Sequence, residues 1–325
     1  MSRFLIIRLS SIGDIVLTTP VVRCLKKQLP DAEIHYLTKK EYRSLLDSNP
    51  YIDKVHTFEG NLTQTISLLK KENIDFIVDL HNNLRSLTIK CLLNKPSFSF
   101  HKLNLLKWLK VQLRIDLLPR IHIVDRYLRT IHEFGISKDN KGLDYYIPEK
   151  DVIKLSDLPV ELQKGFIVLA AGAKHFTKQL PVERMIELSD EIAAPVIILG
   201  GKEDFLKAEK VQQNSINFIF NGCGKYSINQ SASIIQQSKL IITSDTGLMH
   251  IAAALHKVII SVWGNTVPEF GMSPYLPHPD SKIFEVYNLP CRPCSKIGFD
   301  ACPRGHFDCM NKQDYNLIKD YTNSL

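Results

Sequence analysis

Short apolar runs alternate with longer amphipathic stretches along almost the whole chain. In the first half, the short runs have the pattern of strands, and the stretches between them repeat apolar residues three and four positions apart, as helices do. The predicted strands are Arg3–Arg8, Glu33–Leu37, Lys54–Thr57 and Asp75–Leu80, and the predicted helices are Asp14–Gln28, Lys39–Asp47 and Leu62–Lys71. Strands that alternate with helices predict a parallel sheet covered by helices on both faces.

The same alternation restarts after Ser137–Lys164, a polar segment that is interrupted by Pro148 and Pro159 and follows a helical stretch ending near Gly135. Beyond it, the predicted strands are Gly165–Ala171, Pro195–Leu199, Asn217–Phe220, Leu240–Thr243 and Val258–Trp263. The predicted helices of this half are Pro181–Ile192, Asp204–Asn214, Ser227–Gln237 and Leu248–Leu255. The fold class is therefore α/β, with two doubly wound, Rossmann-like domains.

Length and composition agree with two globular domains, because 325 residues exceed one ordinary core and 44% are hydrophobic. We place the domains at 1–155 and 156–325, with a Cys-rich segment at 291–309 and a terminal helix at 312–325. Open α/β sheets bind ligands at the carboxyl ends of their strands, so we expect a cleft between those edges. The sequence shows neither a bilayer-long apolar run nor a leader, so we expect a cytoplasmic protein.

The net charge of +7 is concentrated in one window, where leucines and Trp108 are interleaved with basic residues. The basic residues of this window are Lys102, Lys107, Lys110, Arg114, Arg120, Arg126 and Arg129. Such a pattern fits an anionic membrane surface or an anionic acceptor, and equally a helix with one core face and one solvated basic face. No recognition motif for nucleic acid accompanies the charge, so we expect no nucleic-acid partner.

The first predicted strand runs into the turn LSSIGD, which lacks the second and third glycines of a dinucleotide-binding loop. A nicotinamide dehydrogenase is therefore not indicated. Asp14 stands instead in the first turn of the following helix. A carboxylate there either offsets the helix dipole or points into the predicted cleft as a base.

A second motif, Ser244–Gly247, leads from a strand directly into a helix. Free amide groups at that helix start form an anion site suited to phosphate, although ordinary capping gives the same pattern. The loop after the strand Gly165–Ala171 reads GAKHFTK and carries Lys174 and Lys178. Two lysines at this edge can neutralise a diphosphate, although a solvated loop would have a similar composition.

Several segments, in chain order, resemble the heptosyltransferase-like glycosyltransferases of family nine. They are SSIGD near residue 10, DLHNNLRS at 79–86, the loop Lys178–Pro181, LGG at 199–201, SDTGLMHIAAAL at 244–255 and WGNT at 263–266. The resemblance extends from Arg3 to about Met310. It implies the glycosyltransferase-B architecture and an inverting transfer that needs neither a catalytic metal nor a cofactor. The implied donor is a nucleotide-diphosphate sugar that carries a heptose, as in ADP-heptose, or a related sugar, and the acceptor is the lipid-linked inner core of lipopolysaccharide.

The resemblance also implies a role for individual residues. Asp14 would take the proton of the acceptor hydroxyl, and Lys178 would bind the phosphates. The donor-binding residues would be Gly172, Lys174, Thr177, Asn229, Asp245, Thr246, Gly247 and His250, and the acceptor-binding residues Ser11, Asn83 and Arg85. Asp245 would accept hydrogen bonds from the sugar hydroxyls, whereas His250 would contact either the donor or Asp245.

Two positions depart from the family pattern. Leu180 replaces an aromatic residue before the proline of the lysine loop, and Asn229 stands where some members use a glutamate on the nucleotide ribose. A nucleotide-sugar epimerase or hydrolase would share the architecture, and a non-catalytic saccharide-binding protein could be built on it. Retention of Asp14, Lys178 and the Asp245–Gly247 motif together argues against the non-catalytic protein, whereas product analysis is needed to separate the transferase from an epimerase or hydrolase.

Cysteines gather near the C-terminus, in CRPCSKIGFDACPRGHFDCM. A tetrahedral zinc ion could be held by four of Cys291, Cys294, Cys302, His306 and Cys309. Packed free thiols are an alternative, and a disulfide is disfavoured in a reducing cytosol. We expect no catalytic metal here.

Overall fold

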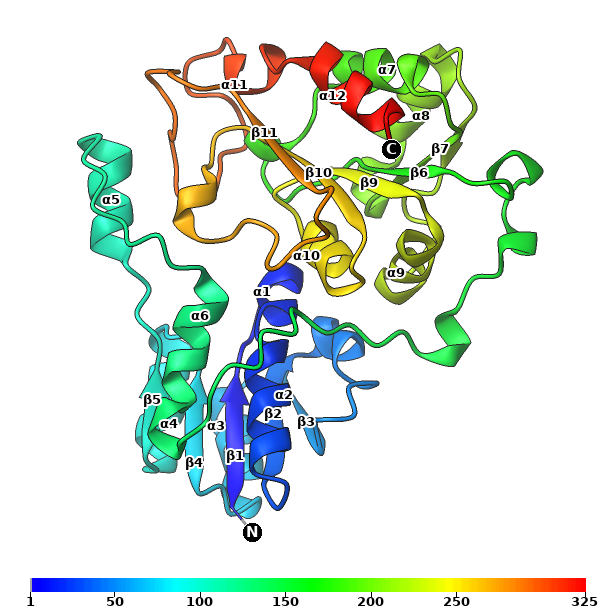
Figure 1. The fold of residues 1–325 in the computed structure, drawn as a ribbon. Helices are drawn as coiled ribbons and strands as arrows, with labels where there is room; N and C mark the ends of the chain where they lie inside the picture. Colours follow the sequence, from blue (N-terminus) through cyan, green and yellow to red (C-terminus); the bar gives the residue numbers. More distant parts are fainter. Residues whose placement is uncertain (1) are drawn as a thin grey trace. The chain divides into compact units, whose positions relative to one another are not determined.

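The computed structural model describes residues 2–325 and divides into two compact units. The first unit consists of residues 2–103 and 121–146, and the second of residues 104–120 and 147–325. Each unit has one sheet in which all strands are parallel (Figure 1). The predicted α/β class with two Rossmann-like domains is therefore confirmed.

The sheet of the first unit has the strand order β3-β2-β1-β4-β5. Its strands are β1 (Arg3–Ile7), β2 (Glu33–Lys39), β3 (Lys54–Phe58), β4 (Phe76–Asp79) and β5 (Ser97–Ser99). The central strand β1 pairs with β2 on one side and β4 on the other, and Leu5, Ile6 and Ile7 are fully buried. A strand covered on both faces is typical of a parallel sheet with helices on both sides.

Helices cover both faces of this sheet. They are α1 (Ile12–Val16), α2 (Thr19–Gln28), α3 (Leu62–Lys71), α4 (Leu84–Leu93) and α6 (Ile123–Leu128), with 3₁₀ turns η1 (Lys40–Leu45) and η2 (Arg129–Phe134). Apolar residues of α3 and α4, such as Ile66 and Ile89, form a core with Leu5 and Ile77 of the sheet. On the other face, Phe4 stacks on the ring of Phe76 and meets Phe134 edge-on.

Two helix predictions in this unit were wrong in detail. The predicted helix Asp14–Gln28 is divided into α1 and α2, because Pro20 has no N–H to continue the hydrogen-bond ladder. The predicted helix Lys39–Asp47 is the 3₁₀ turn η1, and β2 continues to Lys39 before it begins.

The sheet of the second unit has the order β11-β10-β9-β6-β7-β8. Its strands are β6 (Ile167–Ala170), β7 (Val196–Leu199), β8 (Ile219–Asn221), β9 (Leu240–Ser244), β10 (Val258–Trp263) and β11 (Lys282–Glu285). Sequence analysis missed β11, as it missed β5 of the first unit. Both strands lie at a sheet edge and are short and partly polar, so they lack the apolar run that marks a buried strand.

The helices of this unit are α5 (Asn104–Gln112), α7 (Val182–Glu191), α8 (Phe205–Asn214), α9 (Ile228–Gln237), α10 (Gly247–Ala254), α11 (Asp308–Asn311) and α12 (Tyr315–Asn323). Its 3₁₀ turns are η3 (Glu149–Asp151), η4 (Leu155–Asp157), η5 (Val160–Leu162), η6 (Phe176–Lys178), η7 (Lys202–Asp204) and η8 (Pro268–Phe270). Helices α7, α8 and α12 lie on one face of the sheet, and α9 and α10 lie on the other (Figure 1). Met185 of α7, Val211 of α8 and Ile318 of α12 share one core with the strands. Among the described residues, no helix is long and apolar enough to cross a membrane.

Candidate active site

In the first unit, Asp14 lies at the carboxyl end of β1, where a buried arginine holds it. Arg8, the residue after β1, approaches Asp14 Oδ1 with its Nη2 at 2.6 Å. The same guanidinium donates to the carbonyls of Ser10 (2.8 Å) and Leu80 (2.5 Å) and to the Tyr127 hydroxyl (3.0 Å). With four partners, Arg8 is fixed in one geometry, and it fixes Asp14 Oδ1 in turn. Sequence analysis did not single out Arg8, although a charged residue directly after an apolar strand indicates a side chain that acts at the end of that strand.

The other oxygen of the Asp14 carboxylate caps the start of α1. Asp14 Oδ2 accepts hydrogen bonds from the Ser11 amide (3.2 Å) and the Ser11 hydroxyl (2.9 Å). Asp14 thus has the capping role that the sequence left open, and its side chain remains 20% exposed. Each carboxylate oxygen has two lone pairs, so capping does not prevent Asp14 from accepting a further hydrogen bond from a ligand.

His81 follows β4 and belongs to the same edge of the sheet. Burial, together with the positive charges of Arg8 and Lys102, lowers the pKa of His81 to about 4, against the opposing effect of Asp79 and Asp14. The ring is therefore neutral near pH 7. Asp79 is fully buried, and its Oδ1 accepts from the His81 amide at 3.0 Å, which fixes the backbone of this turn. Sequence analysis did not single out His81.

The predicted acceptor-binding residues Asn83 and Arg85 lie on the turn after His81. Asn83 is the N-cap of α4, and its side-chain oxygen accepts from the Ser86 amide at 3.0 Å. Arg85 is exposed and forms no hydrogen bond or ion pair with the other described residues. It lines a surface hollow of about 430 Å³, together with Lys39, Lys40, Glu41, Phe58, Glu59 and Gly60. In its walls Lys39 pairs with Glu41 (3.3 Å) and Lys40 with Glu59 (3.1 Å), so Arg85 is the lining cation that is left to meet an anionic group.

In the second unit, the structure brings together Lys178 and Asp245, which lie in separate segments. Lys178 Nζ is 2.5 Å from Asp245 Oδ2, and the Thr266 hydroxyl donates to the same oxygen at 3.2 Å. Asp245 follows β9, Lys178 ends the turn η6, and Thr266 belongs to the turn after β10. No described residue donates to Asp245 Oδ1, so this oxygen is available to hydroxyl groups of a ligand.

The start of α10 adjoins this cluster. Thr246 is its N-cap, and the Thr246 hydroxyl accepts from the Met249 amide at 3.3 Å and bonds the Thr243 hydroxyl at 3.0 Å. The amides of Gly247 and Leu248 belong to the first turn, where a helix offers no carbonyl partner. An anion at this helix start is therefore stabilised by the amides and the helix dipole. His250 lies one turn further along and is buried.

The remaining predicted donor residues occupy different surroundings. Gly172 packs against Asp204 so closely that a Cβ would stand 2.0 Å from Asp204 Oδ2, so only glycine fits there. Lys174 is exposed on the loop. The Thr177 hydroxyl is buried, accepts from the Phe299 amide (2.8 Å) and donates to the Phe299 carbonyl (3.2 Å). Thr177 therefore anchors the loop that presents Lys178.

Asn229 lies near the start of α9 and is buried. Its side-chain amide donates to Asp151 Oδ2 at 2.9 Å, a contact that orients the side chain.

The Cys-rich segment supports the turn Gly264–Thr266, which sequence analysis recognised only as part of WGNT. Arg292 donates to the carbonyls of Gly264 (2.6 Å) and Thr266 (2.8 Å) and forms an ion pair with Glu285 (2.6 Å). Within this turn, Asn265 is 1% exposed, and neither polar atom of its side chain has a hydrogen-bond partner among the described residues. Arg292 thus positions the turn Gly264–Thr266, and the Thr266 hydroxyl of this turn holds the Asp245 carboxylate.

All seven cysteines are free thiols in the structure. Cys291 Sγ lies 3.8 Å from His306 Nε2, and burial raises the pKa of the Cys294 and Cys309 thiols. Among the described residues, these side chains do not form a set of three ligand atoms that lie within 4.8 Å of one another. Zinc at Cys291, Cys294, Cys302, His306 and Cys309 stays a prediction.

Two Rossmann-like units, each built on one parallel sheet, have the fold of the GT-B class. Residues 63–299 match glycosyltransferase family 9 (heptosyltransferase), and the chain belongs to this family.

Known proteins similar to this chain agree with that assignment. Lipopolysaccharide heptosyltransferase 1 of Campylobacter coli is 25% identical over 292 residues, which cover 80% of this chain and 83% of the relative. Two solved structures share the fold: a family 9 glycosyltransferase from Veillonella parvula (TM-score 0.72, 21% identity, 87% of this chain and 85% of that one) and the E. coli heptosyltransferase WaaC with ADP (TM-score 0.68, 18% identity, 99% of each chain).

The environment of His81 predicts an abnormal titration. We expect its ring to titrate near pH 4 in the folded protein, against about 6.5 in an unfolded chain. Between these values the unfolded chain binds a proton that the folded chain excludes, so this residue lowers the stability as the pH falls from 6.5 to 4. Nitrogen-15 NMR of the histidine rings measures the midpoint. Asp14→Asn should lower it further, because a negative charge is removed; a midpoint near 6.5 would contradict the described environment.

Proposed function

We propose that the protein transfers a heptose from ADP-heptose to the lipid-linked inner core of lipopolysaccharide, with inversion at the anomeric carbon. The observation that carries the proposal is the pairing of Lys178 with Asp245 beside the start of α10, within a chain of the heptosyltransferase family. The E. coli structure with ADP supports an adenine nucleotide as the donor's leaving group. Curated relatives named as lipopolysaccharide heptosyltransferases support the sugar and the acceptor.

The donor's diphosphate would bind at the start of α10. Its charge would be met by the amides of Gly247 and Leu248 and by Lys178, with exposed Lys174 on the same loop. Lys178 then exchanges its contact with Asp245 for phosphate oxygens, which a flexible ammonium with three donors can do. Asp245 is left to accept hydrogen bonds from the hydroxyls of the sugar.

Asp14 would act as the general base. Its carboxylate takes the proton of the acceptor hydroxyl while that oxygen forms a bond to the anomeric carbon, opposite the leaving diphosphate. The bond between the sugar and the phosphate breaks, and its electron pair stays on the diphosphate. Lys178 and the amides of α10 stabilise this developing charge, a task that fixed positive groups perform without a metal ion.

The acceptor's phosphates or carboxylates would bind at the hollow beside Arg85, whose free guanidinium suits such groups. An epimerase or hydrolase would need no acceptor. Release of nucleoside diphosphate that depends on the acceptor therefore separates the transferase from both alternatives, and from a saccharide-binding protein that releases none.

We further propose a cytoplasmic enzyme that touches the inner membrane through α5. No residue of α5 is buried, and Leu105 and Trp108 are 68% and 51% exposed. Its basic residues turn partly inward, since Lys110 pairs with Asp116 (3.0 Å) and Glu269 (3.4 Å). Arg120, beyond the end of α5, is likewise paired with Asp116 (2.9 Å). The exposed apolar side chains are thus the main membrane contact of this helix.

Asp14→Asn should reduce the kcat of transfer by about 10²–10⁴-fold, because the amide cannot take a proton at neutral pH. Donor affinity, measured by calorimetry with ADP-heptose, should stay within about twofold. Asp31→Asn, an exposed residue of the same unit, is the matched control and should keep wild-type turnover. Near-wild-type turnover of Asp14→Asn would overturn the mechanism.

Lys178→Ala should weaken both the binding of ADP and the rate of transfer, since the phosphates lose a charge-assisted contact worth about 1.5–3 kcal/mol. Calorimetric titration with ADP measures the first effect and product formation the second. Lys210→Ala removes an exposed lysine of α8 and should change neither. Unchanged affinity for ADP in Lys178→Ala would place the diphosphate elsewhere.

Leu105→Ser combined with Trp108→Ser should reduce sedimentation with vesicles that contain anionic phospholipid, because two exposed apolar anchors of α5 are lost. Leu206→Ser is a matched control, since Leu206 is 70% exposed on α8. Equal binding of both variants would exclude α5 as the membrane contact. Residual binding should weaken as salt is added, because the remaining attraction is ionic.

A further inference from the structure

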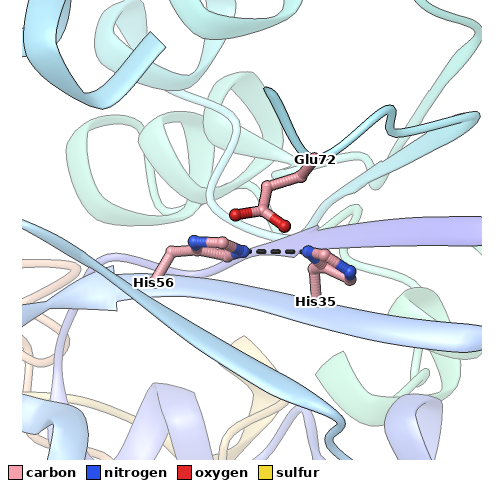
Figure 2. Close-up of side chains that lie close together, drawn as sticks. All are labelled: His35, His56 and Glu72. Carbon is pink, nitrogen blue, oxygen red and sulfur yellow. Dashed lines mark hydrogen bonds between the residues drawn. The ribbon is translucent and has the colours of Figure 1, made fainter. Parts of the chain in front are cut away.

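A cluster of titratable side chains in the first unit has no part in the proposed transfer. His35 comes from β2, His56 from β3, and Glu72 is the residue at which α3 ends. Figure 2 shows the two imidazoles facing each other, with the carboxylate of Glu72 pointing toward them. His35 is the third residue of β2, so the cluster lies toward the amino ends of the strands. Asp14 and His81 lie at the opposite, carboxyl edge of the same sheet.

The distances within this cluster suit a metal ion. His35 Nδ1 and His56 Nε2 are 2.9 Å apart, and each of the three residues offers one ligand atom such that all three atoms lie within 4.8 Å of one another. Two imidazole nitrogens bound to one tetrahedral ion at about 2.1 Å are separated by about 3.4 Å, so an ion requires the pair to open by about 0.5 Å. Among residues 2–325, no other group of three histidine, cysteine or acidic side chains is this close.

A second layer of contacts already orients His35 as a ligand. Its Nε2 is 3.0 Å from Glu33 Oε1, and Glu33 Oε2 is held by Arg3 Nε at 2.7 Å. Because the Glu33 carboxylate can only accept, the proton of the neutral ring is on Nε2, and the lone pair of Nδ1 points at His56. A carboxylate that fixes the tautomer of a ligating histidine in this way is the usual second shell of a metal site.

The cluster is also accessible from solvent, and one carboxylate oxygen of Glu72 is not bound by Lys54. His35 is fully buried, but His56 and Glu72 are only partly so, which leaves a route from solvent. Lys54 Nζ holds Glu72 Oε1 at 2.6 Å and would compete with a metal ion there, whereas Arg3, also nearby, donates to the carbonyl of Glu72 (3.2 Å). The second oxygen of Glu72 is not engaged by Lys54.

We propose that His35, His56 and Glu72 bind a divalent transition-metal ion of the zinc class, with Glu33 as the positioning carboxylate. Two imidazoles and a carboxylate suit Zn²⁺, Co²⁺ or Ni²⁺ and are poor ligands for Mg²⁺ or Ca²⁺. A water molecule fills the remaining coordination position. When the ion binds, the proton that His56 Nε2 donates to His35 Nδ1 moves to His56 Nδ1, so both facing nitrogens offer lone pairs to the ion. The ion then links β2, β3 and the end of α3. Its role is structural, because these elements lie away from the edge of the sheet that carries Asp14.

Cobalt titration of the chelator-treated full chain tests this proposal. Co²⁺ bound by nitrogen and oxygen gives visible d–d bands without the near-ultraviolet charge-transfer band of a thiolate ligand, so the spectrum separates this site from the cysteines. We expect d–d bands that saturate at one ion per chain. His56→Gln and Glu72→Gln should weaken binding by at least about 100-fold, and Glu33→Gln by about 10–100-fold.

His132→Gln, an exposed histidine of the same unit, and Cys291→Ser are the controls, and both should keep the d–d bands. Because His56 and Glu72 are partly exposed, their variants should fold, and equal metal-free melting temperatures would verify this. Zn²⁺ should raise the melting temperature of the wild type but not of His56→Gln. The absence of d–d bands at millimolar Co²⁺, or bands unchanged in His56→Gln, would overturn the proposal without affecting the proposed transfer.

Discussion

Parallel strand pairing is the constraint on which the chemistry of both units depends. Because all strands of a sheet run in the same direction, the residues that follow them meet at one edge. In the first unit this edge receives Arg8 after β1 and His81 after β4. In the second it receives Asp245 after β9 and Thr266 after β10. A shift of one residue in the register would turn each strand's side chains to the opposite face and disperse these groups.

Buried arginines hold the turns at this edge of each sheet in a fixed conformation. Arg8 binds two backbone carbonyls and a tyrosine hydroxyl before it reaches Asp14, and Arg292 binds two carbonyls of the turn Gly264–Thr266 as well as Glu285. A planar guanidinium with five donors can satisfy several acceptors at once, which an ammonium cannot do in a fixed plane. Arg23 does the same for a third region, since it joins α2 to Asp139 and to the Gly142 carbonyl. Turns that would otherwise be loose are thereby held in one conformation.

The sequence predicts the alternation of strands and helices well because buried parallel strands are continuous apolar runs. The strands β5 (SFS) and β11 (KIFE) escape prediction because each is short and its apolar residues are interrupted or flanked by polar ones. An edge position tolerates this pattern but does not require it, since the edge strands β3 and β8 were predicted. The motif resemblance identifies Lys178 and Asp245, but not that they contact each other, because 67 residues separate them. Arg8 and Arg292 were missed for a similar reason: Leu80 and Tyr127, which fix Arg8, and Gly264 and Thr266, which Arg292 binds, lie far away in the sequence. The cluster of His35, His56 and Glu72 is likewise invisible in the sequence, where the three residues follow no ligand spacing.

The two carboxylates at the sheet edges illustrate how one kind of contact can serve two purposes. Asp14 pairs with an arginine that has three further partners within its own unit, so breaking this pair would leave a buried guanidinium poorly satisfied. Asp245 pairs with Lys178, a single ammonium at the end of a short turn. That ammonium can rotate toward an arriving anion at small cost, because its charge is then met by the anion instead of by Asp245. The first pair therefore keeps the Asp14 carboxylate in place, as the proposed role of general base requires. The second lets Asp245 be released when a ligand binds, as the proposed role of receptor for sugar hydroxyls requires.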